Sequence, residues 1–236
     1  MRPDDSTDRR RLFRRHEHLA HKDEIQERVF QIEEGWASRY CVLPDGRRQI
    51  TAIYLPGDYC EPQWLLSGKA DLPIIALTPV KAQVLPLAGV HTRPGDRVMK
   101  LLGAVLEGHV RQTSWIVNLG RKSALERVSD LLAELFGRLQ NVGLVADNRC
   151  NLPLTQQDIA DIVGLTPVHV NRVLGELRSR GLLRFSGKSL HLPDPQALGV
   201  PPRGQPSATA PGQEAGSAAT PQPAGATWVE GKRVAA

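Results

Sequence analysis

The stretch from Leu154 to Arg178 carries the residues best suited to chemistry on another molecule. Val168, Asn171 and Arg172 fall on the outer side of a predicted helix whose inner side is apolar. The planar fork of an arginine matches guanine O6 and N7, and an asparagine amide matches adenine or a phosphate. We therefore predict that these three side chains contact bases in the major groove of double-stranded DNA.

A second set of polar side chains lies near the predicted helix starts and in a turn farther along the chain. Hydroxyl, amide and backbone N–H groups at such places suit phosphate oxygens. Contacts of this kind set the register of a protein on DNA and do not choose a sequence. The predicted phosphate-contacting residues are Thr155, Gln157, Thr166, His169 and Lys188.

Two helices joined by a sharp turn must position these side chains. Thr155 followed by Asp158 can cap the start of the first helix, and Gly164 can end it in a left-handed conformation. Thr166 and Pro167 then form the N-cap and first residue of the second helix. Its buried face is predicted to hold Val170, Val173, Leu174 and Leu177.

Two short strands, Leu182 to Phe185 and Ser189 to Leu192, are predicted around the turn Ser186-Gly187-Lys188. They would add a wing to the two helices. A plain helical hairpin with a glycine turn is the alternative interpretation of the helices alone. The wing favours a winged helix-turn-helix instead.

Between Asp96 and Leu119 the chain predicts one long helix. Residues on one stripe follow alternating spacings of four and three, as in a two-stranded coiled coil. A second stripe, Leu101, Leu106, Val110 and Val117, is expected to lie against the chain's own β-domain. A buried helix in a monomer is the alternative. The predicted dimer seam is Val98, Leu102, Val105, His109, Gln112, Ile116 and Leu119.

The N-terminal region alternates β-rich runs with turn signals, which favours a small antiparallel barrel or jelly roll. The runs are 29–32, 36–43, 49–55, 74–77 and 82–87. Another amphipathic helix is expected from Ser123 to Leu139, followed by a loop from Asn141 to Asn151. From Leu198 onward, Pro, Ala, Gly, Gln and Ser dominate, which predicts a disordered tail.

The bulk composition fits a globular protein of two modest domains: 236 residues, 41% hydrophobic and 23% charged. The formal net charge of +5 favours an anionic partner, although a surplus that small also occurs without nucleic acid. No apolar run approaches the ~20 residues that span a bilayer. We expect a cytoplasmic protein that makes no membrane contact.

Three widely spaced cysteines, Cys41, Cys60 and Cys150, describe neither a disulfide framework nor a Cys-x-x-Cys metal site. A buried cysteine acting as a small hydrophobic residue is favoured over a redox-sensitive thiol. We expect no metal site.

These elements together predict an α+β protein: a jelly-roll-like sensor domain, a dimerisation helix and a winged helix-turn-helix. The predicted boundaries are 1–92 for the β-roll, 93–122 for the helix, 123–197 for the DNA-binding domain and 198–236 for the tail. The expected partners are double-stranded DNA, a second copy of the chain and RNA polymerase.

The chain resembles the Crp/Fnr family of transcription regulators from about Glu17 to Leu192. The resemblance is most specific in 152–183 and in the stretch from Gly35-Trp36 to Pro79. It implies a cyclic-nucleotide-binding-type β-roll, a long dimer helix and a winged helix-turn-helix. The sequences Gly35-Trp-Ala-Ser-Arg-Tyr and Leu43-Pro-Asp-Gly-Arg-Arg-Gln-Ile50 resemble proteobacterial members, most of them with undefined signals.

The chain departs from that family at its ligand site. Members that bind cyclic AMP carry a Gly-Glu pair and an Arg-Ser pair, but Gly57-Asp58 and Ala70-Asp71 stand here. An anion in place of the phosphate's cation argues against a cyclic nucleotide. We also predict an effector pocket around Gly57, Asp58 and Tyr59, although Gly57-Asp58 is mainly expected to form a turn.

Iron–sulfur members need about four cysteines per cluster, and three distant ones do not meet that need. Single His, Met and Cys residues give no pattern for haem. We therefore predict none of these cofactors. The recognition helix also departs from the family, which places there a glutamate that reads cytosine; here Val168 is suited to a thymine methyl group.

The resemblance implies a homodimer on a pseudo-palindromic operator, with a signal that passes from the β-roll through the helix at 96–119. A small-molecule-binding module with secondary or lost DNA binding is the alternative. The sequence offers no Ser-His-Asp pattern, phosphate loop or carboxylate pair at a recognisable spacing, so we do not expect an enzyme.

Overall fold

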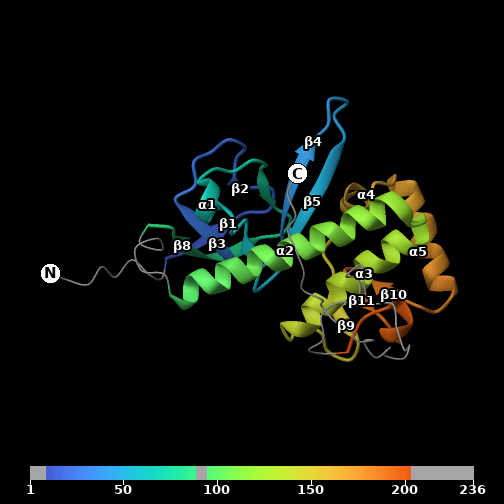
Figure 1. Cartoon of the computed structure of the whole chain (residues 1–236). Helices are drawn as coiled ribbons and strands as arrows, with labels where there is room; N and C mark the ends of the chain where they lie inside the picture. Colours follow the sequence, from blue (N-terminus) through green and yellow to red (C-terminus); the bar gives the residue numbers. More distant parts are fainter. Residues whose placement is uncertain (1–8, 89–94, 203–236) are drawn as a thin grey trace, which may run out of the picture.

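The computed structural model describes residues 9–88 and 95–202 (Figure 1). The N-terminal elements are β1 (Arg9–Phe13), β2 (His18–Ala20), β3 (Arg28–Glu34), β4 (Ala37–Val42), β5 (Arg48–Tyr54), β6 (Tyr59–Cys60), α1 (Trp64–Ser67), β7 (Ile74–Ala76) and β8 (Val80–Pro86). The elements that follow are α2 (Asp96–Arg121), α3 (Ala124–Asn141), β9 (Arg149–Asn151), α4 (Gln156–Val163), α5 (Pro167–Ser179), β10 (Arg184–Ser186), β11 (Ser189–His191) and the short helix η1 (Gln196–Leu198).

The N-terminal domain is a β-roll of two antiparallel sheets, ordered β1-β8-β3-β6 and β2-β7-β4-β5. Side chains of β8 alternate between buried and half-buried from Val80 to Val84, as expected for a strand with one face on a core. The rings of Phe13 and Phe30 meet edge to face between the sheets, with centroids 5.4 Å apart. The predicted α+β class with a β-roll is confirmed.

The β-rich region begins earlier than the sequence predicts. The five expected runs correspond to β3, β4, β5, β7 and β8, but β1 and β2 precede them and β6 lies between. The sequence of β1, Arg-Arg-Arg-Leu-Phe, has little apolar content. It forms a strand because it pairs with β8 from Arg9↔Val84 to Phe13↔Val80.

Gly35 and Trp36 turn the chain between the two sheets. Gly35 has a φ of +86°, and a Cβ at this position would lie 2.0 Å from the carbonyl oxygen of Pro79. The backbone N–H of Trp36 donates to the Thr78 hydroxyl at 2.8 Å. Only glycine fits such a close approach of two backbones.

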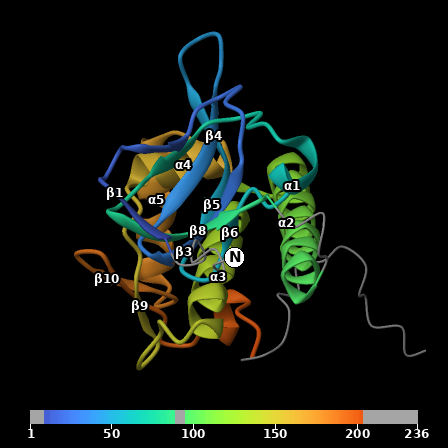
Figure 2. The same ribbon diagram turned by 90° about the vertical axis from the view of Figure 1, so that its left-hand side faces the viewer.

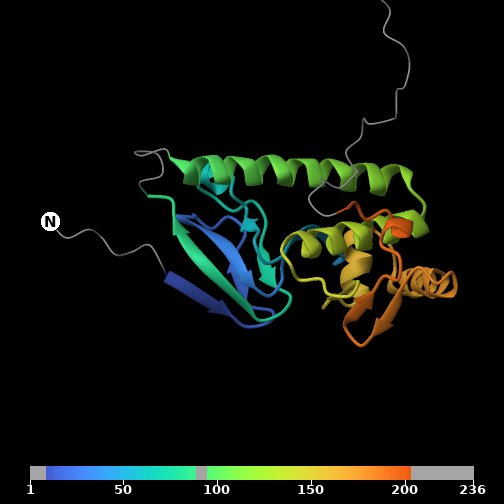
Figure 3. The ribbon, with the colours of Figure 1, turned by 90° about the horizontal axis from the view of Figure 1, so that it is seen from below.

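The long helix α2 runs beside both domains, which lie on the same side of it (Figures 2 and 3). Its observed span closely matches the predicted one. Leu101, 1% exposed, belongs to the core of the β-roll. The predicted boundary at 92/93 falls outside the described residues.

The C-terminal domain packs α4, α5 and η1 against α3. The last part of the predicted loop at 141–151 is wrong, because β9 pairs with β11 and widens the wing to three strands in the order β10-β11-β9. The tail also begins later than predicted. Leu198 and Val200 are buried in this core, while residues 203–236 lie outside the described part.

One apolar core joins the two domains. Ile50, Ile53 and Leu55, from β5 and its end, belong to the same buried cluster as α3, α4 and α5. The β4–β5 hairpin is therefore part of the β-roll and also packs against the C-terminal domain. Among the described residues, no helix is apolar over a length that could cross a bilayer.

Candidate nucleic-acid interface and effector cavity

Both ends of α4 and the start of α5 form as the capping signals predict. The Thr155 hydroxyl accepts from the backbone N–H of Asp158 at 3.0 Å, and the carboxylate of Asp158 accepts from the Thr155 N–H at 3.0 Å. Gly164 ends α4 with a φ of 65°, and Thr166 caps α5 ahead of Pro167. The helix-turn-helix is thus set by local sequence.

The outer face of α5 is open. Val168 is 70% exposed, and Asn171 and Arg172 are exposed beside it. Within the described residues, Arg172 has neither an ion pair nor a hydrogen-bond partner for its guanidinium. The predicted base-contacting side chains therefore share one accessible surface.

The predicted phosphate-contacting residues are also accessible. Thr155, Gln157, Thr166, His169 and Lys188 are all exposed. Gln157 donates to Asp161 at 2.6 Å, and the His169 ring lies 3.3 Å from the Thr166 hydroxyl. Lys188 lies in the turn between β10 and β11.

The wing carries two exposed arginines, Arg149 and Arg184, that the sequence did not indicate as part of the interface. His191 of β11 pairs directly with Arg184 of β10 on one side and with Arg149 of β9 on the other. Directly opposed residues point to the same face of a sheet, so three basic side chains form a row. Burial, together with the two arginines, lowers the pKa of His191. A prediction of β9 as a third strand of the wing would have placed Arg149 opposite His191.

The exposed apolar residues of α2 form a different stripe from the predicted seam. Leu106, Val110 and Val117 are 67%, 49% and 38% exposed, so the expectation that they pack on the β-domain is wrong. Together with Met99 and Leu102 they face away from both domains. Val98, Val105, Gln112 and Leu119 of the predicted seam are half-buried against the chain itself; Leu102, His109 and Ile116 are exposed.

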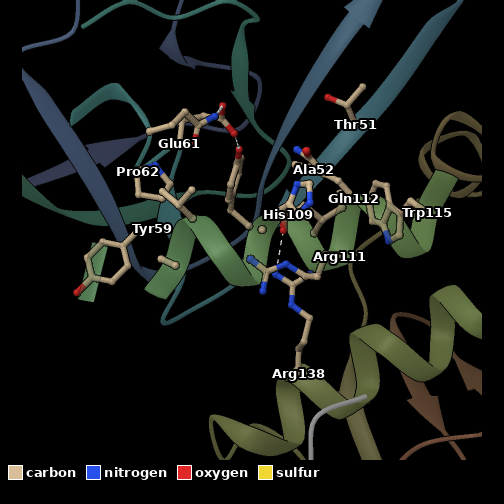
Figure 4. A pocket seen from close by; sticks show the side chains of 16 residues that line it. Thr51, Ala52, Tyr59, Glu61, Pro62, His109, Arg111, Gln112, Trp115 and Arg138 are labelled. Atoms are coloured by element: carbon tan, nitrogen blue, oxygen red, sulfur yellow. Dashed lines mark hydrogen bonds between the residues drawn. The ribbon is translucent and has the colours of Figure 1, made fainter. Parts of the chain in front are cut away.

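A cavity of about 180 Å³ lies between β5, the residues around β6, and α2 (Figure 4). Tyr59, of the predicted effector pocket, lines it. Gly57 and Asp58 do not. Other polar or aromatic wall residues are Glu61, His109, Arg111, Gln112, Trp115 and Arg138.

One wall of the cavity is a buried charge network. Glu61, 3% exposed, accepts from Arg39 at 2.7 Å and also bonds Tyr54 and Gln63. Burial and the nearby Glu61 carboxylate raise the pKa of Tyr54 well above its ordinary value. Glu61 also has a φ of 49°, which is uncommon for a residue with a side chain. The carboxylate is thus already engaged by the protein.

Gly57 and Asp58 form a turn that reaches the C-terminal domain. Gly57 has a φ of +97°, and the Asp58 carboxylate accepts from the Leu55 N–H at 2.6 Å. The same carboxylate forms an ion pair with Arg138 of α3. The interpretation of this pair as a turn holds, and the ion pair with α3 is a role that the sequence did not indicate.

A sensory β-roll that carries an exposed winged helix-turn-helix on a long helix is the architecture of a DNA-binding transcription regulator. Residues 10–92 match the model of the cyclic nucleotide-binding domain, and residues 126–199 match the model of the Crp-like helix-turn-helix domain. The chain belongs to the Crp/Fnr family of transcription regulators.

Two relatives and one solved structure illustrate the similarity. The transcriptional activatory protein AadR of Rhodopseudomonas palustris is 34% identical over 76% of this chain and 75% of its own length. The nitrogen fixation regulation protein FixK of Bradyrhizobium diazoefficiens is 32% identical over 79% of each chain. The structure of FixK2 from Bradyrhizobium japonicum is 31% identical, with a TM-score of 0.72 over 81% of this chain and 95% of that one.

Proposed function

We propose that the chain acts as a homodimer on a pseudo-palindromic operator, with one α5 helix in the major groove of each half-site. The observation that carries this is the open face of α5, where Arg172 has no partner among the described residues. With two-fold geometry, the half-sites lie about 10 bp apart from centre to centre.

Within each half-site the three outer side chains of α5 read bases. Arg172 pairs with guanine O6 and N7, Asn171 addresses adenine, and Val168 contacts a thymine methyl group. The high exposure of Val168 supports a role outside the core. A large apolar side chain in this position loses water only when a partner covers it.

Contacts to the DNA backbone surround the outer face of α5 in this proposal. Thr155, Gln157, Thr166, His169 and Lys188 contact phosphates in this proposal, and Arg149 and Arg184, on either side of His191, add positive charge on the wing. These residues contribute affinity and salt dependence, and the α5 side chains contribute the choice of sequence.

The dimer forms along the exposed stripe of α2. Met99, Leu102, Leu106, Val110 and Val117 follow helical spacing, with Thr113 filling the interval between the last two. Both domains cover the opposite side of α2, so a second copy can approach this stripe (Figure 3). Ile116, 70% exposed, flanks it. The proposed dimer seam is thus rotated from the predicted one: Leu102 belongs to both, and Ile116 lies at the edge of the new seam.

The effector in this proposal binds in the cavity beside α2 and is small. About 180 Å³ is below the ~300–1,000 Å³ typical of sites for drug-sized ligands. A cyclic nucleotide does not fit the residues present. Ala70 is buried, Asp71 is exposed and brings negative charge, and Glu61 is already bonded by Arg39.

The cysteines do not fit an iron–sulfur cluster. Cys41, Cys60 and Cys150 lie in β4, β6 and β9, on different sheets, and two of them are buried. Such a cluster takes about four thiolates that converge on one point. We therefore propose a regulator that carries no resident cofactor and catalyses no reaction.

Relatives named as activators support a contact with RNA polymerase, and DNA binding supports a location in the cytoplasm. Selection of bound sequences from random DNA at moderate salt tests the proposed function. We expect an inverted repeat, bound by a dimer. Failure to select any sequence would leave a small-molecule-binding module instead.

A further inference from the structure

Arg48, the first residue of β5 in the β-roll, forms hydrogen bonds to helix α4 of the DNA-binding domain. Its Nε donates to Asp161 Oδ2 and one terminal nitrogen donates to Asp158 Oδ1, each at 2.7 Å. The guanidinium thus bridges two carboxylates that lie one helical turn apart. Gln49 adds a bond of 3.1 Å from its amide nitrogen to the carbonyl oxygen of Ile162.

The bridge is largely shielded from water. The side chain of Arg48 is 28% exposed, and those of Asp158 and Asp161 are 12% and 8% exposed. Burial alone would raise the pKa of Asp158, but hydrogen bonds from Thr155 and Arg48 outweigh it and hold that pKa below its ordinary value. Both carboxylates need the cation, because an uncompensated buried charge is costly.

Apolar packing also holds α4 against β5. The apolar contact of Ile50 with the C-terminal core has no strong directional preference. Next to Arg48, a cleft of about 280 Å³ lies between the β-roll and α4, lined also by Arg15, His16 and Thr155. A planar guanidinium that holds two fixed acceptors is directional, so it can set the angle of α4.

The same strand also walls the effector cavity. Thr51, Ala52, Ile53 and Tyr54 line the cavity, and Arg48 lies three residues before Thr51. At about 3.3 Å per residue, the two ends of β5 lie within about 20 Å of each other. A shift of β5 at the cavity therefore moves the guanidinium that holds α4.

We infer that Arg48 is a positioning residue for DNA binding, which holds α4, and through it α5, at the angle that suits the operator. The bridge also neutralises two carboxylates close to Thr155, a proposed phosphate contact. This inference rests on the proposed function. It gives β5 a route for the effector signal within one protomer, in addition to α2.

The test compares Arg48→Gln with Arg47→Gln in the full chain. Arg47 is the matched control, because it is the adjacent residue, is exposed and, among the residues that the structure describes, forms a side-chain pair only with Asp45 of its own hairpin. We expect Arg48→Gln to weaken operator binding about 5- to 50-fold, within the range of coupling between sites. Arg47→Gln should bind as the wild type does.

Two readouts separate positioning from other roles. A lost phosphate contact would reduce the salt slope of binding by about 1, whereas a lost positioning residue leaves it unchanged. Hydrogen exchange should become faster in α4 of Arg48→Gln, with a far-ultraviolet spectrum that remains native. Unchanged affinity, or a reduced slope, would overturn the inference.

Asp161→Asn provides the second arm, since Asp158 also caps α4. Each single variant should lower the affinity for the operator. The double variant, Arg48→Gln with Asp161→Asn, should bind the operator no more weakly than the single variant with the lower affinity. Fully additive losses would contradict a shared bridge. If the wild-type chain selects no DNA sequence at all, the proposed function fails first, and that outcome is distinct from these.

Discussion

Arg138 and Asp58 join helix α3 of the DNA-binding domain to the turn beside the effector cavity. They form an ion pair in which both side chains are largely buried, 16% and 18% exposed. Arg138 also donates to the carbonyl oxygen of Ile53 at 2.9 Å and pairs with Glu134. The turn and α3 are therefore fixed to each other by charge.

Removing this cation should destabilise the protein. Arg138→Met leaves Asp58 and Glu134 in a shielded site without their partner, at a cost of about 3 kcal/mol in the free energy of unfolding. Urea denaturation measures the change. Arg121→Met, at the exposed end of α2, is the control and should change stability by less than about 0.5 kcal/mol.

Arg172→Ala should weaken specific binding by about 1–3 kcal/mol and relax the choice of one base pair in each half-site. The reason is the loss of a bidentate guanine contact. Binding to a set of operators with single substitutions measures it. Unchanged preference at every position would contradict the role of Arg172.

Leu106→Lys should dissociate the dimer, because it places like charges face to face in the centre of the exposed stripe. Ile116→Lys, at the edge, should weaken the dimer less. Glu107→Lys is the matched control: it is exposed on the next residue and outside the stripe. Sedimentation equilibrium reports the state of each variant. A stable Leu106→Lys dimer would refute this seam.

The bridge at Arg48 predicts a specific dependence of stability on pH. The folded-state pKa of Asp158 is lowered, so its contribution is present at neutral pH and lost as pH falls through the carboxyl range, between about pH 5 and about pH 2. The stability difference between wild type and Arg48→Gln should therefore shrink over that range. A constant difference would mean that Arg48 does not act through the carboxylates.

The cysteines should differ in reactivity. Burial raises the pKa of Cys150 to about 12 and raises that of Cys60 as well, so neither forms much thiolate at pH 8. Cys41 is only half-buried. Alkylation of the native protein should modify Cys41 first, and all three thiols should react after denaturation. Fast labelling of Cys150 in the native state would contradict its burial.

Signals that act over a few residues were enough to predict much of this molecule. The capping pair Thr155 and Asp158, the left-handed Gly164 and the Thr166-Pro167 start form as the sequence indicates. The same is true of the span of α2. These features depend on hydrogen bonds and dihedral preferences within one or two helical turns, so distant parts of the chain cannot easily override them.

Pairing between distant segments could not be predicted in the same way. Strands β1 and β9 are short and mostly polar, and each exists because another strand supplies its hydrogen bonds. The bridge from Arg48 to Asp158 and Asp161 joins residues more than one hundred positions apart. No local pattern indicates which acids an arginine will meet.

By itself, the sequence determined the helix-turn-helix, the long helix and the family of the protein, because each depends on periodicity or on motifs along the chain. Only the tertiary structure decided which apolar stripe of α2 is left open. Both stripes have helical spacing, and hydrophobic burial has no direction of its own. The positions of the β-roll and of α3 covered one stripe and left Leu106 and its neighbours for a partner.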